Sequence, residues 1–240
     1  SRSTKIVATI GTATNGSKII KNLTKTGVNV FRLNFSHGNH GDHLKSITHI
    51  RSAEKKMNSN VAILADLQGP KFRIGPVKNE SKVIKGSNYI FDKDPKIGDI
   101  ERVNLPHDEI FNSLSVGSNI LIDDGKLQFK VQDISNNEIK TEVVIGGVIK
   151  SNKGLNLPDV VLNTNPLTTK DIEDLKFILN QEIDWIALSF VQKLRDVEEV
   201  KKHIGDKAGV IAKIEKPSAL KELNEIIESC DGIMVARGDL

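Results

Sequence analysis

Short apolar runs alternate with amphipathic segments at the start of the sequence. Residues 5–11, 28–36 and 61–67 are apolar and rich in β-branched side chains, which is typical of strands. The two segments between them, 17–26 and 42–57, space their apolar residues as surface helices do. Strand, helix, strand, helix and strand in this order predict βαβ units and a parallel sheet.

The same alternation returns near the end of the sequence. In chain order, the predicted elements are a helix at 169–180, a strand at 184–190, a helix at 192–204, a strand at 209–215, a helix at 217–229 and a strand at 232–236. Ser17 and Thr169 are the predicted N-caps of the first and third helices. Because a complete barrel of this kind needs eight strands, we predict an α/β fold, an incomplete TIM (β/α)8 barrel that lacks its last two βα units.

The segment between Pro70 and Pro158 has a different pattern, in which no helix is predicted. Its short alternating runs lie at 71–75, 88–91, 102–105, 119–122, 127–131 and 138–145. Turn dipeptides such as Asp124-Gly125 and Gly146-Gly147 separate them. We therefore predict an antiparallel β-domain inserted into the barrel, with boundaries at 1–70 and 159–240 for the barrel and 71–158 for the insert.

Composition and charge exclude several classes of protein. Lys and Arg number 34 and Asp and Glu 31, a net charge of +3, and aromatic residues are only 4% of the chain, which argues against a nucleic-acid partner. The single cysteine, Cys230, rules out a disulfide within the chain. No apolar run approaches the ~20 residues of a membrane helix, and the first residues do not read as a signal peptide. We expect a cytoplasmic protein without a membrane partner.

Polar and charged residues end four of the predicted strands. They are Arg32, Asn34 and Ser36 on one face of the second strand, Asp66 on the third, Lys213 and Glu215 on the fifth, and Arg237 and Asp239 on the sixth. The C-terminal ends of barrel strands meet at one rim, where active sites lie. Charges are costly to bury unless they are paired or bind a ligand, so this convergence predicts an active site rather than structural ion pairs.

The residue types at this rim suit phosphoryl transfer. Glu215 and Asp239 are hard oxygen donors on neighbouring strands, which is how proteins hold Mg²⁺. Lys213 is a fixed positive charge beside them, and arginines such as Arg32 and Arg73 can clamp phosphate. No Walker loop, dinucleotide fingerprint or protein-kinase motif is present, so a nucleotide must be held in another way.

Seven sequence strings, in order along the chain, resemble the pyruvate kinase family. They are FRLNFSHG at 31–38, ADLQGPKFRIG at 65–75, DDG at 123–125, KGLNLP at 153–158, ALSF at 187–190, AKIEKP at 212–217 and MVARGDL at 234–240. MVARGDL is the most specific, whereas DDG alone is an ordinary hairpin turn. The predicted insert falls where that family has its small β-barrel lid domain.

The resemblance implies a role for each matching residue in the reaction that moves phosphate from phosphoenolpyruvate to ADP and gives pyruvate and ATP. Glu215 and Asp239 would bind Mg²⁺ or Mn²⁺. Lys213 would neutralise the phosphoryl group in flight and the developing enolate. Arg32, assisted by Arg73, would hold phosphate. Backbone N–H groups at Gly238 and Asp239 would hold the substrate carboxylate. A monovalent cation would be bound by Asn34, Ser36 and Asp66. The residues near the nucleotide would be His37, Asp124, Lys153 and Asn156.

Several departures from the family pattern stand out. Leu67 and Gln68 replace a common threonine and lysine, and Lys71 stands where many members have glutamate. If the Lys71 ammonium reaches the monovalent-cation site, it supplies the ion's charge permanently, so we predict that K⁺ is not required. The family's later strands, with a catalytic threonine, and its C-terminal domain are not in these 240 residues. We therefore expect the isolated chain to be inactive. The resemblance also implies that the parent protein is a homotetramer.

Three other hypotheses remain. A metal-dependent aldolase or lyase acting on pyruvate enolate would use the same pair of carboxylates. A non-catalytic fragment would only bind a ligand or a partner chain. A zinc site could use His37, His40 and His43, but on a helix the first and third of these are roughly 120° apart, and the glycines between them favour a loop.

Overall fold

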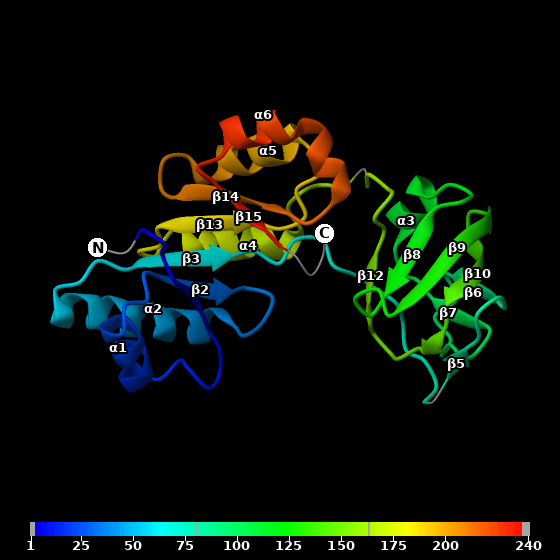
Figure 1. Ribbon diagram of the computed structural model, residues 1–240, viewed down its shortest axis with the longest axis horizontal. Coiled ribbons are helices and arrows are strands. Elements are labelled where there is room, and N and C mark those ends of the chain that lie inside the picture. The colour runs from blue at the N-terminus through cyan, green and yellow to red at the C-terminus, as the bar shows by residue number, and fades with distance from the viewer. Residues whose placement is uncertain (1–2, 80, 163, 237–240) are drawn as a thin grey trace. The chain divides into compact units, whose positions relative to one another are not determined.

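The computed structural model describes residues 3–79, 81–162 and 164–236, and it divides into two compact units (Figure 1). The first unit comprises Ser1–Pro70, Pro166–Ile214 and Glu222–Val235. The second comprises Lys71–Asn165, Glu215–Lys221 and Ala236–Leu240. No helix in the described ranges is long and apolar enough to cross a membrane.

The first unit is built on a six-stranded sheet in which all neighbouring strands are parallel. Its strands, in spatial order, are β1 (Val7–Ile10), β2 (Val30–Asn34), β3 (Ala62–Asp66), β13 (Trp185–Leu188), β14 (Gly209–Ile214) and β15 (Gly232–Val235). β13 pairs directly with β3, so the sheet continues as if the intervening chain were absent. The predicted α/β class is confirmed.

Helices connect these parallel strands, and their ends follow from local capping. They are α1 (Ser17–Lys25), α2 (His40–Met57), α4 (Thr169–Ile178), α5 (Leu194–Ile204) and α6 (Leu223–Ser229), the last preceded by the 3₁₀ turn Pro217–Glu222. In α2 the Asn39 side chain accepts from the Asp42 N–H, and Asp42 accepts in return from the Asn39 N–H, which is a capping box. The predicted N-caps were wrong by one residue, because Gly16 caps α1 and Thr168 caps α4.

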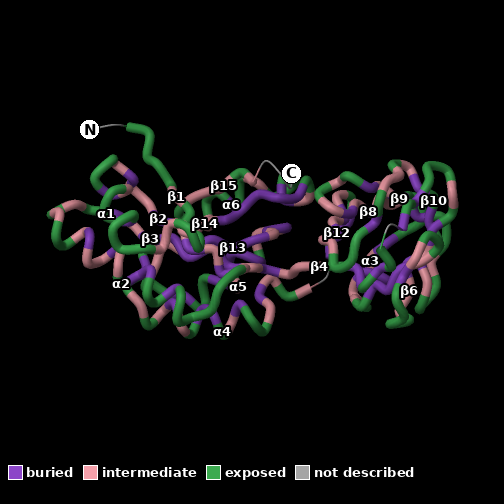
Figure 2. The backbone as a smooth tube through the Cα atoms, turned by 90° about the horizontal axis from the view of Figure 1, so that it is seen from below, coloured by how far each residue is buried: buried purple, intermediate pink, exposed green. Residues whose placement is uncertain are grey.

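The core of the first unit lies on both faces of the central strands. All but the first residue of β3 and of β13 are buried (Figure 2). Strands covered on both faces are expected to be continuously apolar rather than alternating. Ile63, Leu64, Ile186 and Leu188 are at most 1% exposed, as this arrangement requires.

Arg51 of α2 ties the helix to the N-terminal ends of two strands. Its guanidinium donates to Asp184 Oδ2 at 2.6 Å, to Glu54 Oε2 at 2.8 Å and to the Glu182 carbonyl at 2.7 Å. The same Asp184 oxygen accepts from the Ile63 N–H at 2.7 Å. One side chain therefore fixes where β3 and β13 begin.

Arg51→Met is expected to lower the free energy of unfolding by about 1–3 kcal/mol, because it removes several charge-assisted hydrogen bonds at a half-buried site. Arg195→Met, at an exposed position of α5, is the matched control and should change it by less than about 0.5 kcal/mol. Urea titrations followed by circular dichroism measure both. Equal midpoints for the two variants would contradict the role given to Arg51.

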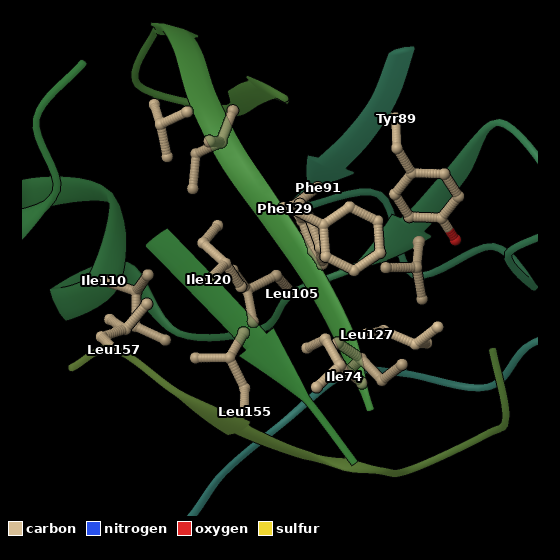
Figure 3. Close-up of a cluster of buried hydrophobic side chains, with 14 of the residues drawn as sticks. Ile74, Tyr89, Phe91, Leu105, Ile110, Ile120, Leu127, Phe129, Leu155 and Leu157 are labelled. Carbon is tan, nitrogen blue, oxygen red and sulfur yellow. The ribbon is translucent and has the colours of Figure 1, made fainter. Parts of the chain in front are cut away.

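The second unit contains a seven-stranded sheet. Its spatial order is β4 (Phe72–Arg73), β12 (Gly154–Asn156), β8 (Asn119–Ile122), β9 (Leu127–Ile134), β10 (Glu138–Ile145), β6 (Asn88–Asp92) and β7 (Arg102–Asn104). β5 (Lys82–Val83) and β11 (Gly147–Val148) form a separate antiparallel pair. The buried aromatic residues Tyr89, Phe91 and Phe129 pack together at the centre of this unit (Figure 3).

Two features of this segment contradict the sequence-based expectation. A helix, α3 (Asp108–Ser113), occupies a stretch predicted to contain none. It is six residues long, too short to show a helical period, and Ile110 and Phe111 anchor it to the core. In addition, β7 pairs with β6 in parallel, while the other neighbouring pairs of the seven-stranded sheet are antiparallel.

Candidate active site

The sheet register of the first unit brings the predicted strand-end residues to one edge. Asn34 lies opposite Asp66, and Asp66 lies opposite Ala187 on β13. β13 in turn pairs Leu188 with Ala212, the residue before Lys213. Because the strands are parallel, their carboxyl ends face the same side, and the side chains there can meet.

Asp66 is the centre of a charged cluster at this edge. Its side chain is 1% exposed, and Oδ2 accepts from Arg32 Nε at 2.7 Å and pairs with Arg32 Nη2 at 2.5 Å. Lys213 Nζ lies 3.2 Å from the other oxygen, Oδ1. Oδ1 is buried and makes no hydrogen bond to any described residue. Each carboxylate oxygen thus faces a cation, which is how a charge is accommodated inside a protein.

Ser189, which directly follows β13, is a further hydrogen-bond partner of Lys213. Lys213 Nζ donates to Ser189 Oγ at 2.9 Å, and Ser189 Oγ donates to the Leu67 carbonyl at 2.7 Å. Ser189 belongs to the ALSF string, but sequence reasoning assigned it no role. The available signal was its position near the carboxyl end of the predicted strand 184–190, as for the other predicted site residues.

The loop after β2 is held by its own hydrogen bonds. Asn34 Oδ1 accepts from the Ser36 N–H at 3.0 Å, and the Asn34 carbonyl accepts from the His37 N–H at 3.2 Å. These three residues were predicted to serve the monovalent cation and the nucleotide. Arg32 reaches the same edge, where it donates to Thr9 Oγ1 at 3.0 Å.

His40 and His43 make structural contacts in the first unit. Contrary to the loop expectation, both lie in the first turn of α2. His40 Nε2 is 2.7 Å from Asp174 Oδ1, and its ring stacks on Phe177. His43 Nε2 is 3.0 Å from the His37 carbonyl and its ring stacks on Phe35, and burial lowers the pKa of His43. His43 therefore supports the loop that contains Ser36 and His37, whereas His40 contacts α4.

The second unit brings together some of the residues predicted to lie near the nucleotide. Lys153 Nζ pairs with Asp123 Oδ1 at 2.8 Å, and Lys126 pairs with Oδ2 at 3.1 Å. Hydrogen bonds from these lysines lower the pKa of Asp123. Asp124 follows with a left-handed φ of 57°. Sequence reasoning selected Asp124 but not its neighbour Asp123. Asp123 pairs with Lys153, which is distant in the sequence, so no local pattern predicts this ion pair.

Arg73 and Asn156, two further predicted site residues of this unit, lie on β4 and β12. Arg73 Nη1 donates to the Asn152 carbonyl at 2.7 Å, and the Arg73 N–H donates to His107 Nε2 at 3.1 Å. Asn156 pairs with Leu121 across β12 and β8. Lys71 is half-buried at the start of the unit. Arg73 is thus held by a neighbouring loop and by a histidine that the sequence did not single out.

The predicted metal ligands are only partly within the described residues. Glu215 follows β14 directly and is 3% exposed. A buried carboxylate at a strand end is a hard oxygen donor and suits Mg²⁺ or Mn²⁺. Its neighbour Lys216 is also buried, and burial lowers the pKa of Lys216 to about 8. Arg237, Gly238 and Asp239 lie outside the described residues.

A polar pocket of about 570 Å³ in the second unit contains none of the predicted site residues. It is lined by Asp92, Lys93, Asp94, Ser135, Asn137 and Glu138. Asp92 pairs with Arg102, Lys93 with Asp108, and Asp94 with Lys96. Three charged residues of its lining are therefore engaged in ion pairs.

Comparison with known proteins identifies the family. The sequence profile described as "Pyruvate kinase, barrel domain" matches residues 1–240. The chain belongs to the pyruvate kinase family. Pyruvate kinases from Agrobacterium vitis and Methylorubrum extorquens are 46% and 47% identical to it, over 100% of this chain and 51% and 50% of theirs.

A solved structure agrees with this assignment to the pyruvate kinase family. The crystal structure of a pyruvate kinase from Cryptosporidium parvum matches with a TM-score of 0.94 and 33% identity, over 100% of this chain and 51% of that one. The match supports the pyruvate kinase barrel fold for the chain. The chain spans about half the length of the curated relatives and of the solved structure that it matches.

Proposed function

We propose that this sequence forms part of a pyruvate kinase, which transfers phosphate from phosphoenolpyruvate to ADP and gives pyruvate and ATP. The observation that carries the proposal is the cluster of Arg32, Asp66 and Lys213 at the carboxyl edge of the parallel sheet. It holds a lysine ammonium and a guanidinium in fixed positions by means of one buried carboxylate. Preorganised positive charge stabilises the negative charge of a phosphoryl group while it is transferred between oxygens.

The proposed roles follow the family resemblance residue by residue. Lys213 and Arg32, with Arg73, act on the transferred phosphoryl group. Backbone groups of Gly238 and Asp239 bind the substrate carboxylate. The nucleotide is bound by His37, Asp124, Lys153 and Asn156, and the monovalent-cation site is formed by Asn34, Ser36 and Asp66. The buried Oδ1 of Asp66 makes no hydrogen bond to a described residue, but Lys213 Nζ lies 3.2 Å from it.

Glu215 and Asp239 are the proposed ligands of Mg²⁺ or Mn²⁺. When bound, the metal ion neutralises negative charge on the substrates and helps to orient their oxygens. Among the described residues, the chain's own contribution is the buried carboxylate of Glu215, which directly follows β14.

The proposed domain organisation is an incomplete (β/α)8 barrel at 1–70 and 159–240 with an inserted antiparallel β-barrel lid at 71–158. The single parallel sheet that joins β3 to β13 supports the insertion. The largely antiparallel seven-stranded sheet supports the class of the insert. We also propose a cytoplasmic location and a homotetrameric parent, as the family resemblance implies.

The test is a coupled assay in which the full-length protein carrying this sequence is given phosphoenolpyruvate, ADP and Mg²⁺. Pyruvate and ATP should form in equal amounts. If phosphoenolpyruvate is not consumed while an aldol derived from pyruvate is cleaved without ADP, the protein is an aldolase or lyase instead. If the folded full-length protein turns over neither substrate, the fragment is a binding module.

We predict that the full-length enzyme works without K⁺. Lys71 replaces a residue that is often glutamate in the family, and a fixed ammonium at ~4 Å can interact with another charge by about 4 kcal/mol at an effective dielectric near 20. The Asp66 carboxylate, moreover, is already balanced by Arg32 and Lys213.

Steady-state assays in a buffer with only a bulky tetraalkylammonium cation measure this requirement. Activity within about twofold of that in K⁺ is expected for wild type, and a K⁺ requirement should arise in Lys71→Glu. The control is Lys78→Glu at an exposed position of the same unit. Strong activation of the wild-type enzyme by K⁺ would show that Lys71 does not replace the ion.

A further inference from the structure

The hydroxyl group of Ser189 has its hydrogen-bonding direction fixed by its neighbours. A serine hydroxyl has one proton to donate and lone pairs that accept. Ser189 Oγ donates this proton to the Leu67 carbonyl at 2.7 Å. Its lone pairs therefore remain available to accept a hydrogen bond from Lys213 Nζ, which lies 2.9 Å away. Ser189 is 3% exposed, and the ammonium of Lys213 therefore meets an oriented dipole in a dry environment, where such contacts are strong.

The backbone around Ser189 leaves this side chain little room to move. A Cβ atom at Gly69 would lie 2.9 Å from Ser189 Cβ, closer than real side chains approach, so only glycine fits. Gly69 also has a φ of 67°, which favours glycine. Its N–H donates to Oδ1 of Asp171, which is fully buried. Close packing on one side and a carbonyl acceptor on the other hold Ser189 in one position.

The bond to the Leu67 carbonyl also relates Lys213 to Asp66. Leu67 is the residue after Asp66, and its N–H donates to the Ala187 carbonyl, which continues the pairing of β3 with β13. Ser189 therefore links the Lys213 ammonium to the backbone next to the carboxylate that faces it. Three strands, β3, β13 and β14, contribute to one defined position of the ammonium group.

We propose that Ser189 is a positioning residue that holds the Lys213 ammonium in place for phosphoryl transfer. The proposal rests on the function proposed above and adds to it a residue with no assigned role. Ser189 acts through Lys213 and need not touch the substrate. Because a shift of about 1 Å in a catalytic group can cost up to 10²-fold in rate, loss of this contact should affect turnover more than binding.

The experiment is Ser189→Ala in the full-length protein. kcat should fall about 10- to 100-fold, while the KM for phosphoenolpyruvate changes less than about twofold, because the uniform binding contacts remain. Ser46→Ala is the matched control, since Ser46 is also buried in the first unit and donates to a main-chain carbonyl, that of Asp42. It should leave kcat unchanged.

A double-mutant comparison separates positioning from general damage to the fold. If Ser189 acts through Lys213, then Ser189→Ala should cause no further loss of kcat in a Lys213→Met background. An equal loss in both backgrounds overturns the proposal, and so does a Ser189→Ala variant with wild-type kcat. If Ser189→Ala does not fold, Ser189→Cys replaces it. A sulfur is a weak acceptor, so an intermediate kcat supports the proposal and a wild-type kcat overturns it.

The same assays distinguish failure of this inference from failure of the proposed function. An active wild-type enzyme with an unaffected Ser189→Ala variant refutes only the positioning role. A folded wild-type protein that does not consume phosphoenolpyruvate refutes the proposed function, and the role of Ser189 in it as well.

Discussion

Lys213→Met in the full-length protein is expected to lower kcat by about 10²–10³-fold while phosphoenolpyruvate still binds. Methionine keeps most of the length and apolar volume of lysine but removes its positive charge. That charge matters most when negative charge crowds the transition state, so its loss should affect kcat and kcat/KM together. Steady-state kinetics and equilibrium binding of phosphoenolpyruvate are the two measurements.

The control for this substitution is Lys207→Met. Lys207 is exposed and lies just before β14, at the end of the strand opposite to Lys213. Its replacement should leave kcat within about twofold of wild type, because a solvated lysine contributes little to a distant site. A Lys213→Met enzyme with near-normal turnover would refute the role given to Lys213, whatever its effect on stability.

The Lys213 substitution also changes the balance of charge at Asp66. In the wild-type protein Asp66 faces Arg32 and Lys213 on opposite oxygens. Without Lys213, Arg32 remains as its ion-pair partner among the described residues. Removal of one partner of a buried ion pair can destabilise a protein by about 3–5 kcal/mol. Circular dichroism and unfolding midpoints must therefore accompany the kinetics, so that a loss of folded enzyme is not mistaken for a loss of catalysis.

The strands of the first unit were predictable because their signal is local. An apolar run followed by an amphipathic helix repeats with a regular length, and the central strands β3 and β13 are buried apart from their first residues. The short helix α3 was not predictable in this way, because six residues give fewer than two turns. The parallel pairing of β6 with β7 was missed for a different reason. Pairing direction depends on the path of the chain, which alternation within a strand does not report.

The candidate site shows the same division between local and non-local information. The sequence placed Arg32, Asp66 and Lys213 at strand ends and so at one edge. Sequence reasoning assigned Asp66 to a cation site and Arg32 to phosphate binding. It did not predict the hydrogen bond between these two side chains. Side-chain pairs across strands depend on register, which only the folded sheet determines. Ser189 went unassigned because its partners are distant in the sequence: Leu67 directly follows β3 and Lys213 lies on β14.

Glu215→Gln is expected to raise the Mg²⁺ concentration needed for half-maximal activity by at least about 10-fold. Outer-shell partners of metal ligands typically contribute 10- to 100-fold in affinity, so loss of a direct anionic ligand should cost no less. Glutamine keeps the size of the side chain at this buried position and replaces one charged oxygen with an amide nitrogen, which cannot bind a hard cation. Asp239→Asn should have the same effect.

Two readouts make the metal assignment testable without relying on activity alone. Titration of activity with Mg²⁺ gives the half-saturating concentration, and binding of Mn²⁺ followed by electron paramagnetic resonance gives the affinity in the absence of turnover. Glu225→Gln, at an exposed position of α6, is the control and should leave both unchanged. If the Mn²⁺ affinity of Glu215→Gln equals that of wild type while its kcat falls, then Glu215 acts on the substrates or on Lys213, and the metal must be held by other ligands.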